Sequence, residues 1–392
     1  MNGTKPLTVK HHSLTGRITD ELMHQAFRAV RKNRGAAGVD RVSLKMFEAN
    51  LDDNLQSLMR HMKQGTYRPA PVRRTYIDKG NGKQRPLGIP TVRDRVAQEV
   101  LRRLLNPLFE KLFHDHSYGF RPRRSCHDAV REIDRLHKLG FTHVVDADIA
   151  GCFDAIPHSL IMTGLRNVVA DGNVLNLVER MLAAGVMEDN VVTPTTVGTP
   201  QGGVLSPLLA NIALNFLDWR FDAAGVRFVR YADDFVVLSR SKRRAEEARQ
   251  LVQRAVDDMG LTLSPEKTVV TNFRQGFVFL GFDIAARRRR MRDKAVERYR
   301  AKIRALTIRS HNLDERQMAR INAVIRGTAR YFSTPFSTCV RQFRYLDAWT
   351  RKRLRMMKLK RICKSDNYKL KNKHLRRMGL VGLSDYLITA TK

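Results

Sequence analysis

Two adjacent acidic residues, Asp233 and Asp234, stand between two apolar strand-like runs, and this arrangement strongly constrains the fold. Residues 226–231 and 235–238 are rich in β-branched, aromatic and aliphatic side chains, the types that fill strands. The pattern therefore predicts a hairpin with two carboxylates at its tip. Neighbouring carboxylates repel each other, whereas Mg²⁺ prefers such oxygen ligands, so a metal site is one interpretation. A solvated turn is the alternative, because Asp is a common turn residue.

A third acidic residue favours the metal site. Residues 142–148 form a β-like run that ends at Asp148, shortly before Gly151, where we expect the chain to turn. Nucleotidyl transfer uses two metal ions about 4 Å apart, one activating the attacking hydroxyl and the other holding the leaving group. One Asp on one strand and an Asp-Asp hairpin on another would supply the carboxylates for such a pair of ions. Asp146 lies on the same strand face as Asp148, and we interpret it as a flanking acid.

Several further blocks carry a family resemblance. Residues 231–234, Tyr-Ala-Asp-Asp, resemble the YxDD box of reverse transcriptases. The order of the other blocks resembles the group II intron reverse transcriptase/maturase family, from about residue 20 to the C-terminus. These blocks are 35–40, 83–90, 118–122, 148–153, 199–207, 263–268 and 279–282.

The resemblance implies an α+β fold of the right-hand polymerase type, with fingers and a palm built on an antiparallel sheet, followed by an α-helical thumb/maturase domain. The expected boundaries are 1–140 for the N-terminal extension and fingers, 141–285 for the palm, and 286–392 for the thumb and maturase domain. In the first part, apolar periodicity and turn residues predict helices over 20–32, 44–64 and 93–112, with strands over 72–77 and 84–89.

The resemblance also assigns site residues. The catalytic positions are Asp148, Asp233 and Asp234, and together with Ile149 they form the metal-binding set for two Mg²⁺ ions. The nucleotide-binding set is Lys79, Arg85, Phe153, Gln201, Gly202 and Lys267.

Each nucleotide-binding position has an implied role and a simpler alternative. Phe153 matches the residue that excludes a ribose 2′-hydroxyl, although it also suits an ordinary core. Gln201 matches the residue beside the incoming nucleotide, and the following glycine allows close backbone approach. Arg85 and Lys79 match basic residues that grip the triphosphate, with solvated surface charges as the alternative. Lys267 matches a lysine that protonates pyrophosphate, or is an ordinary loop lysine.

The chain is strongly basic, and the charge is unevenly distributed. Its formal net charge is +34 over 392 residues, which indicates a polyanionic partner. From Ala286 onward there are 31 Lys and Arg against 7 Asp and Glu. Helices are predicted there over 295–308, 313–331 and 340–357, with aromatic residues among the arginines. The expected RNA-binding residues, which could instead form a solvated basic face, are Arg341, Arg344, Arg351, Lys352 and Arg353.

Other features concern the setting in which the protein acts. Its four cysteines have no C-x-x-C spacing, which argues against a zinc site or a disulfide framework. No apolar span reaches membrane length and the first residues show no signal-peptide core, so we expect no membrane partner and a bacterial cytoplasmic ribonucleoprotein. The sequence ends without a Cys- and His-rich H-N-H endonuclease, which resembles the short maturases of class C introns.

We therefore expect an RNA-directed DNA polymerase that also binds its group II intron RNA as a maturase, assisting splicing and target-primed reverse transcription. Its partners would be that intron RNA, an RNA template with a DNA primer, target DNA and deoxynucleoside triphosphates. One alternative is a splicing-only RNA-binding maturase with a vestigial polymerase site. Another is a domesticated or defence-associated reverse transcriptase acting on some other RNA.

Overall fold

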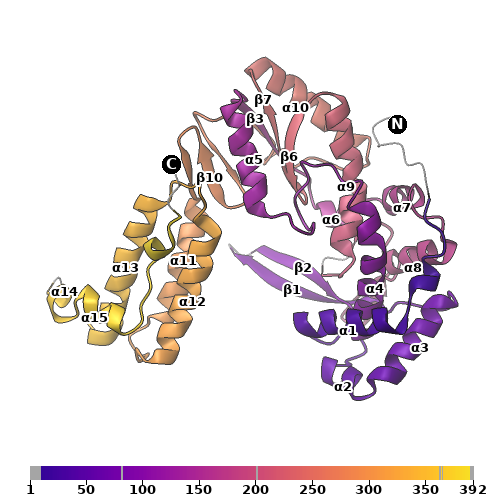
Figure 1. The fold of residues 1–392 in the computed structure, drawn as a ribbon, viewed down its shortest axis with the longest axis horizontal. Coiled ribbons are helices and arrows are strands. Elements are labelled where there is room, and N and C mark those ends of the chain that lie inside the picture. The colour runs from indigo at the N-terminus through magenta and orange to yellow at the C-terminus, as the bar shows by residue number, and fades with distance from the viewer. Residues whose placement is uncertain (1–9, 81–82, 200–201, 362, 364, 389–392) are drawn as a thin grey trace. The chain divides into compact units, whose positions relative to one another are not determined.

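A computed structural model describes residues 10–80, 83–199, 202–361, 363 and 365–388 (Figure 1). The chain divides into two compact units, Met1–Ala129 with Val145–Val270, and Val130–Val144 with Thr271–Lys392. The first unit combines helices with antiparallel strand pairs, and the second is mainly helical after a small sheet. This mixed content, with a helical C-terminal region, confirms the predicted α+β class.

Local capping signals mark the helices of the first unit, although the single helix expected over 44–64 is two helices separated at Asn50. In α1 (Asp20–Asn33), Thr19 caps the N-terminus by accepting a hydrogen bond from the Leu22 N–H, and two acids occupy the first turn. Its buried residues, Met23, Ala26, Phe27 and Val30, recur at three- and four-residue spacing. The other helices of this unit are η1 (Thr15–Arg17), α2 (Leu44–Ala49), α3 (Leu51–Lys63), α4 (Val92–Phe109), α6 (Cys152–Ala155), α7 (His158–Arg166), α8 (Gly172–Leu182), α9 (Ser206–Ala223) and α10 (Lys242–Asp257).

One sheet of the first unit has the strand order β2-β1-β4-β5. Its strands are β1 (Val72–Gly80), β2 (Lys83–Ile89), β4 (Val186–Glu188) and β5 (Val191–Thr193). β1 and β2 are antiparallel with Ile77 opposite Arg85, and β1 runs parallel to β4. This sheet places Arg85 on a long two-stranded arm.

A second sheet carries the acidic residues. It has the order β6-β7-β3-β8, with β6 at Arg227–Tyr231, β7 at Asp234–Ser239, β3 at His143–Asp148 and β8 at Val269–Asn272. β6 and β7 form the predicted antiparallel hairpin, in which Tyr231 lies opposite Asp234. Asp148 is the last residue of β3, which neighbours β7, so the strand order brings the two acidic positions to adjacent strands.

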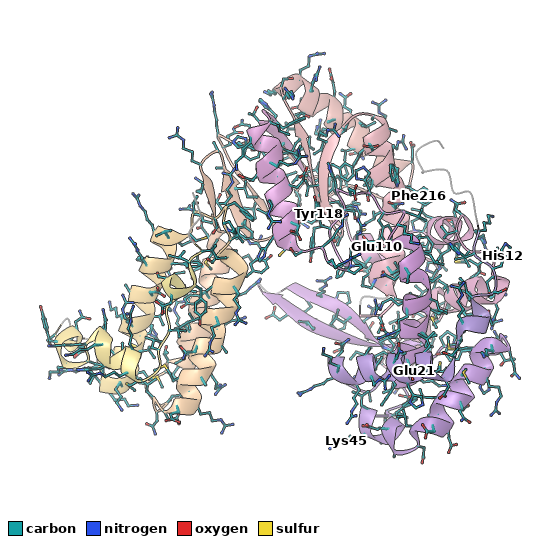
Figure 2. The ribbon with its side chains drawn as sticks, in the orientation of Figure 1. His12, Glu21, Lys45, Glu110, Tyr118 and Phe216 are labelled. Atoms are coloured by element: carbon teal, nitrogen blue, oxygen red, sulfur yellow. The ribbon has the colours of Figure 1, made fainter. Side chains whose placement is uncertain are left out.

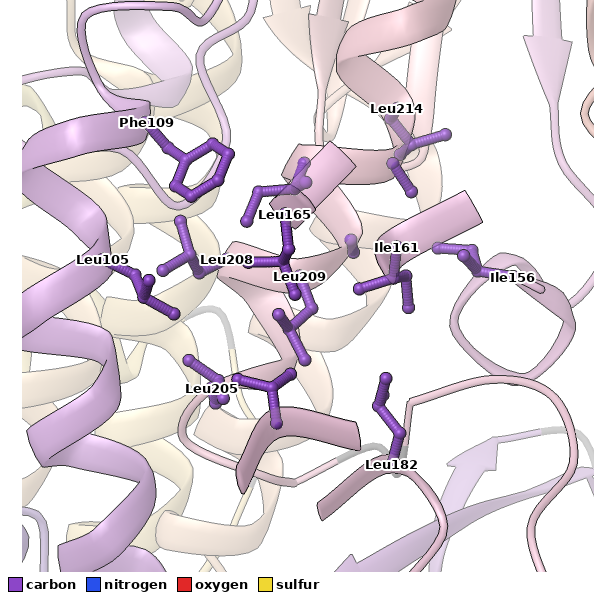
Figure 3. Packing of buried hydrophobic residues seen from close by; sticks show 14 of the residues in the cluster. Leu105, Phe109, Ile156, Ile161, Leu165, Leu182, Leu205, Leu208, Leu209 and Leu214 are labelled. Carbon is purple, nitrogen blue, oxygen red and sulfur yellow. The ribbon is translucent and has the colours of Figure 1, made fainter. Parts of the chain in front are cut away.

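The core of the first unit forms around α9. This helix is buried on most of its faces, including Leu208, Leu209, Ile212 and Leu217. Figure 3 shows Leu205, Leu208 and Leu209 of this region among side chains from neighbouring elements. Burial all round fixes α9 within the unit, and with it the polar side chains that α9 directs to the hairpin.

The second unit contains a three-stranded sheet and a helical array. The sheet order is β11-β10-β9, with β9 at Phe277–Phe279, β10 at Phe282–Ala285 and β11 at Arg288–Met291. The helices are α11 (Asp293–Leu306), α12 (Glu315–Phe332), α13 (Val340–Leu359), α14 (Asp366–Lys369), α15 (Asn372–Arg377) and η2 (Leu383–Tyr386), and α5 (Cys126–Lys138) has residues in both units. The Phe282 ring contacts the rings of Tyr331 and Phe332, which joins the sheet to α12.

Candidate active site

The two adjacent aspartates lie at a tight turn. Because Tyr231 pairs with Asp234, the turn consists of Ala232 and Asp233, and Ala232 has a left-handed backbone with φ of 60°. Gly119 passes directly against this turn, where a Cβ atom at position 119 would collide with the backbone nitrogen of Ala232. This close approach explains the glycine at position 119, because any larger residue there would strain or displace the turn.

A buried arginine holds the same turn from within the protein. Arg230 and Asp218 both have fully buried side chains and form an ion pair, with 2.6 Å between Arg230 Nε and Asp218 Oδ1. Arg230 Nη1 donates to Asn211 Oδ1 at 3.0 Å and to the carbonyl oxygen of Ala232 at 2.8 Å. Arg230 Nη2 donates to Ser117 Oγ at 2.8 Å. The turn is thus bonded to α9 and to the chain segment before Gly119.

The strand end at Asp148 is held by neighbouring backbone. The Asp148 carbonyl accepts a hydrogen bond from the N–H of Ser264 at 2.8 Å, and Ala150 donates to the carbonyl of Thr262 at 2.8 Å. The Asp148 carboxylate itself accepts a hydrogen bond from Lys267 Nζ, with 2.6 Å to Oδ2. The segment that contains Lys267 therefore lies directly beside the first acidic position.

The acidic groups influence one another electrostatically. Burial raises the pKa of Asp233, and the negative charge of Asp148 adds to the increase, whereas the positive charges of Arg85 and Lys267 oppose it. Burial and the charge of Asp148 raise the pKa of Asp146 to about 7. The hydrogen bond to Asp148 raises the pKa of Lys267, which keeps its ammonium group protonated at neutral pH. The structure therefore brings Asp148, Asp233, Arg85 and Lys267 within electrostatic reach of each other.

The oxygen-rich, crowded character of this site fits divalent cations. Carboxylates whose pKa is raised by burial and by a neighbouring negative charge, as for Asp233, are stabilised by added positive charge, and Mg²⁺ prefers carboxylate ligands. Among the described residues, no three Asp, Glu, His or Cys side chains are grouped as a complete metal cluster. Lys267 instead neutralises Asp148. Assignment of Asp148, Ile149, Asp233 and Asp234 as metal ligands stays a prediction.

The expected nucleotide-binding residues are partly placed. The backbone at Thr199 donates to the carbonyl of Phe153 at 2.6 Å, so the segment before Gln201 lies against Phe153. Gly202 has a φ of 112°, and a Cβ there would collide with the carbonyl oxygen of Gly88 in β2. Gln201 and the side chain of Lys79, which belongs to β1, lie outside the described part of the chain.

Phe153 has an aromatic neighbour that the sequence analysis did not single out. The Phe120 ring meets the Phe153 ring edge-on, with 6.3 Å between centroids and an interplanar angle of 88°. Phe120 has a left-handed backbone and keeps 55% of its surface exposed. An exposed aromatic ring in a strained backbone conformation beside the active site indicates a functional surface. In the sequence, Phe120 was marked only by lying within the block 118–122.

The expected RNA-binding residues do not all point to solvent. Arg341, Arg344 and Lys352 are exposed on α13, and Arg351 is half-buried. Arg353 instead donates to Thr307 Oγ1 at 3.1 Å and to the Thr307 carbonyl at 3.0 Å, which caps the end of α11. Arg353 therefore has an intramolecular role that its basic surroundings in the sequence conceal.

A basic cleft lies along α13 in the second unit. It has a volume of about 450 Å³ and is lined by Arg344 and Arg351 of α13 and by Lys373 and Arg376 of α15, together with the acids Asp347 and Asp385. A second hollow of about 800 Å³ shares Arg351 with the first and adds Lys352. In the described part of the chain, no hydrogen bond or ion pair engages Arg344, Arg351 or Lys373. Free cations lining a concave surface are typical of a polyanion-binding site.

Sequence reasoning missed the Arg230 network. Its local signal was weak, because Arg230 is one of two arginines in the strand run 226–231 and its side-chain acceptors come from residues 117, 211 and 218. Their proximity depends on how α9 packs, which no local pattern encodes. In addition, no helix in the described ranges combines the length and apolarity needed to cross a membrane.

Comparison with known proteins agrees with this geometry. Residues 77–284 match the family described as reverse transcriptase (RNA-dependent DNA polymerase), and residues 296–379 match the group II intron, maturase-specific domain. The chain therefore belongs to the reverse transcriptase family. Within this family it carries the maturase-specific domain of group II intron proteins, as the resemblance of its sequence blocks predicted.

Three curated relatives illustrate the match. Protein YkfC of Escherichia coli (strain K12) is 34% identical over 318 residues, covering 70% of this chain and 83% of that protein. Group II intron-encoded protein LtrA of Lactococcus lactis subsp. cremoris is 34% identical over 304 residues, covering 60% and 50% respectively. A 91 kDa protein in the cob intron of Schizosaccharomyces pombe is 32% identical over 293 residues, covering 59% and 36%. The chain thus spans about half the length of LtrA.

Proposed function

We propose that this protein is an RNA-directed DNA polymerase that also binds its own group II intron RNA as a maturase, assisting splicing and target-primed reverse transcription. One observation carries the polymerase part: Asp148 ends β3, Asp233 lies in the turn of the adjacent hairpin with Asp234 at the start of β7, and Lys267 pairs with Asp148. Carboxylates on neighbouring strands suit the two-metal chemistry of nucleotidyl transfer. In this proposal residues 1–140 form the N-terminal extension and fingers, 141–285 the palm and 286–392 the thumb and maturase domain.

The side chains divide the work of the reaction. Asp148, Asp233 and Asp234, with the backbone at Ile149, would hold two Mg²⁺ ions. When bound, these ions supply Lewis-acid activation of the primer 3′-hydroxyl and charge neutralisation on the triphosphate. Arg85 contacts phosphate oxygens of the deoxynucleotide. Lys267, whose Nζ lies 2.6 Å from Asp148 Oδ2, is placed to deliver a proton to the departing pyrophosphate.

The polymerase part is tested by removing the paired acids. Asp233→Ala/Asp234→Ala should abolish Mg²⁺-dependent primer extension on an RNA template while leaving binding to structured RNA unchanged. The matched control is Asp52→Ala/Asp53→Ala, another adjacent acid pair, exposed in the first turn of α3, which should keep wild-type extension. Wild-type protein that binds RNA but makes no DNA would instead support a splicing-only maturase.

The maturase part rests on the basic cleft of the second unit. Arg344, Arg351 and Lys373 line it without a hydrogen bond or ion pair among the described residues, so they are free to contact phosphates of intron RNA. Each phosphate contact contributes a slope of about −0.7 to −0.9 in log affinity against log salt concentration. The binding should therefore weaken steeply as salt increases.

The cleft is tested by neutralising these three cations. The triple variant Arg344→Gln/Arg351→Gln/Lys373→Gln should lower affinity for the intron RNA and reduce the salt slope by about 2 to 3. The control variant Lys242→Gln/Arg243→Gln/Arg244→Gln removes equal charge from the exposed first turn of α10. Equal losses in both variants would mean that net charge alone, and not the cleft, attracts the RNA.

A further inference from the structure

The Arg230 guanidinium has all five of its N–H donors engaged. One proton on Nε and one on Nη2 go to the two oxygens of Asp218, and the other Nη2 proton goes to Ser117. The two protons on Nη1 go to Asn211 and to the carbonyl of Ala232. A guanidinium has five donors in a fixed planar arrangement, so these bonds leave Arg230 no freedom to reorient.

The bond to Ala232 has a direct consequence for the acidic residues. The Ala232 carbonyl belongs to the peptide unit that joins Ala232 to Asp233, and that unit is planar. Fixing its oxygen therefore fixes the direction in which the chain enters Asp233. Asp234 follows as the first residue of β7, so both acids take their positions from the same turn.

The turn needs such support because its backbone is strained. Ala232 carries a Cβ yet has a φ of 60°, a left-handed conformation that L residues adopt only when their surroundings impose it. The hydrogen bond from Arg230 to the Ala232 carbonyl is one constraint on this backbone. The backbone of Gly119, which packs against the Ala232 nitrogen, is a second. Asn211 joins these two constraints, because its Nδ2 donates to the Gly119 carbonyl at 2.8 Å while its Oδ1 accepts from Arg230.

Stability alone is a weak reason for this network. A buried ion pair contributes little net stability, and well-packed apolar side chains of similar volume often replace one without loss. Only the hydrogen bond to the Ala232 carbonyl acts on the turn itself. Arg230 is also paired along the backbone: its N–H donates to the His116 carbonyl, and its carbonyl accepts from Tyr118, which is labelled in Figure 2.

We propose that Arg230 is a positioning residue for metal binding: through the Ala232 carbonyl it holds the strained turn that directs Asp233 and Asp234 toward the cations. This inference rests on the proposed polymerase function. It assigns to a fully buried side chain, which contacts neither substrate nor metal, control over the affinity of the site for divalent cations.

The test uses Arg230→Lys, which keeps the positive charge but cannot reproduce the planar five-donor arrangement. Loss of a residue that orients metal ligands lowers metal affinity or activity by about 10- to 100-fold. We expect the Mg²⁺ concentration for half-maximal primer extension to rise by about tenfold, with KM for the primer-template unchanged. Mn²⁺ binding to the free full-length protein, followed by electron paramagnetic resonance, should weaken by a similar factor.

Two further variants separate positioning from stability. Arg289→Lys alters another buried arginine, paired with Asp134 at 2.6 Å and bonded neither to the turn nor to the partners of Arg230, and should keep the wild-type Mg²⁺ dependence. Arg230→Met/Asp218→Leu replaces the ion pair by apolar side chains, and should recover thermal stability without recovering Mn²⁺ affinity. Recovery of wild-type Mn²⁺ affinity in this double variant would overturn the proposal, as would an equal Mg²⁺ shift in Arg289→Lys.

The outcomes also distinguish this inference from the proposed function. If wild-type protein binds Mn²⁺ but synthesises no DNA, the polymerase function fails, and the Mn²⁺ affinities still decide the role of Arg230. If the wild type synthesises DNA and Arg230→Lys matches it in both Mg²⁺ dependence and Mn²⁺ affinity, the positioning role is wrong and the polymerase assignment stands. If the wild type neither binds Mn²⁺ nor synthesises DNA, both are overturned.

Discussion

At the scale of single residues, the acidic turn depends on how closely another segment can approach it. Gly119 lies so near the Ala232 nitrogen that a Cβ would collide with it. The constraint is steric, and it acts on the same peptide units that carry Asp233. A single methyl group at position 119 therefore has a predictable effect on the active site.

We predict that Gly119→Ala lowers the rate of primer extension by about 10- to 100-fold, since a displacement of about 1 Å in a catalytic group has an effect of that size. Steady-state extension kinetics at saturating Mg²⁺ measure it. Gly172→Ala is the control, because a Cβ at the start of α8 meets no atom within 4 Å. Unchanged kinetics in Gly119→Ala would show that the turn tolerates movement.

Residue-scale reasoning also applies to sugar selection. If Phe153 excludes the 2′-hydroxyl and Phe120 supports its ring edge-on, then removing either ring should weaken selection against ribonucleotides. We predict that Phe153→Ala increases the use of ribonucleotides relative to deoxynucleotides by about 10-fold or more, with a smaller increase in Phe120→Ala. Competitive single-nucleotide incorporation gives the ratio of kcat/KM values. A Phe153→Ala enzyme with wild-type selectivity would make Phe153 an ordinary packing residue.

The sequence predicted the positions of the acids but not the side chains that hold them. Asp233 and Asp234 are readable because they interrupt an apolar strand pattern, which is a local signal. Arg230 depends on Asp218, Asn211 and Ser117, which come together only through packing of α9. Contacts of this kind depend on the tertiary structure, so hydrophobic periodicity and turn residues do not predict them.

At the scale of elements, most predicted helices and strands exist, and their boundaries show what periodicity misses. The helix predicted over 340–357 is observed as α13, and the strand predicted over 84–89 as β2. The single helix predicted over 44–64 is wrong, because α2 and α3 are separated at Asn50, whose φ and ψ are −125° and 52°. The apolar spacing continues across Asn50, so the sequence pattern does not show the break, which is seen only in the backbone angles.

One helix cap yields a prediction with a defined pH dependence. Asp171 caps α8, accepting from the Val174 N–H at 3.1 Å and from Thr15 through its N–H and hydroxyl. Burial opposes these hydrogen bonds, but the hydrogen bonds prevail and lower the pKa of Asp171. The folded state thus binds this proton more weakly than the unfolded state, so the stabilisation exists above about pH 4 and is lost as the pH falls through the folded value.

We therefore predict that Asp171→Ala lowers the free energy of unfolding by about 1 kcal/mol at pH 7, as for other caps, and by less below pH 4. Urea denaturation at both pH values measures the difference. Asp171→Asn is the control, since an amide oxygen still caps the helix but does not titrate. A deficit in Asp171→Ala that stays constant between pH 7 and pH 3 would contradict the role of the carboxylate.

At the scale of the whole molecule, charge and chemistry are assigned to different parts of the chain. The acidic site lies in the first unit, whereas most of the net charge of +34 lies from Ala286 onward, where 31 Lys and Arg stand against 7 Asp and Glu. The sequence predicted this division from composition, and the family matches follow it, with the reverse transcriptase match at 77–284 and the maturase match at 296–379. If the two functions follow this division, DNA synthesis and intron RNA binding are separable by mutation.

The most direct test is a reciprocal comparison of Asp233→Ala/Asp234→Ala with Arg344→Gln/Arg351→Gln/Lys373→Gln. Each variant is assayed for Mg²⁺-dependent extension of a short primed RNA template and for affinity to the intron RNA. The account predicts that the first variant loses extension and keeps RNA affinity, and that the second loses RNA affinity and keeps extension. Loss of both properties in either variant, or retained extension without the paired aspartates, would contradict it.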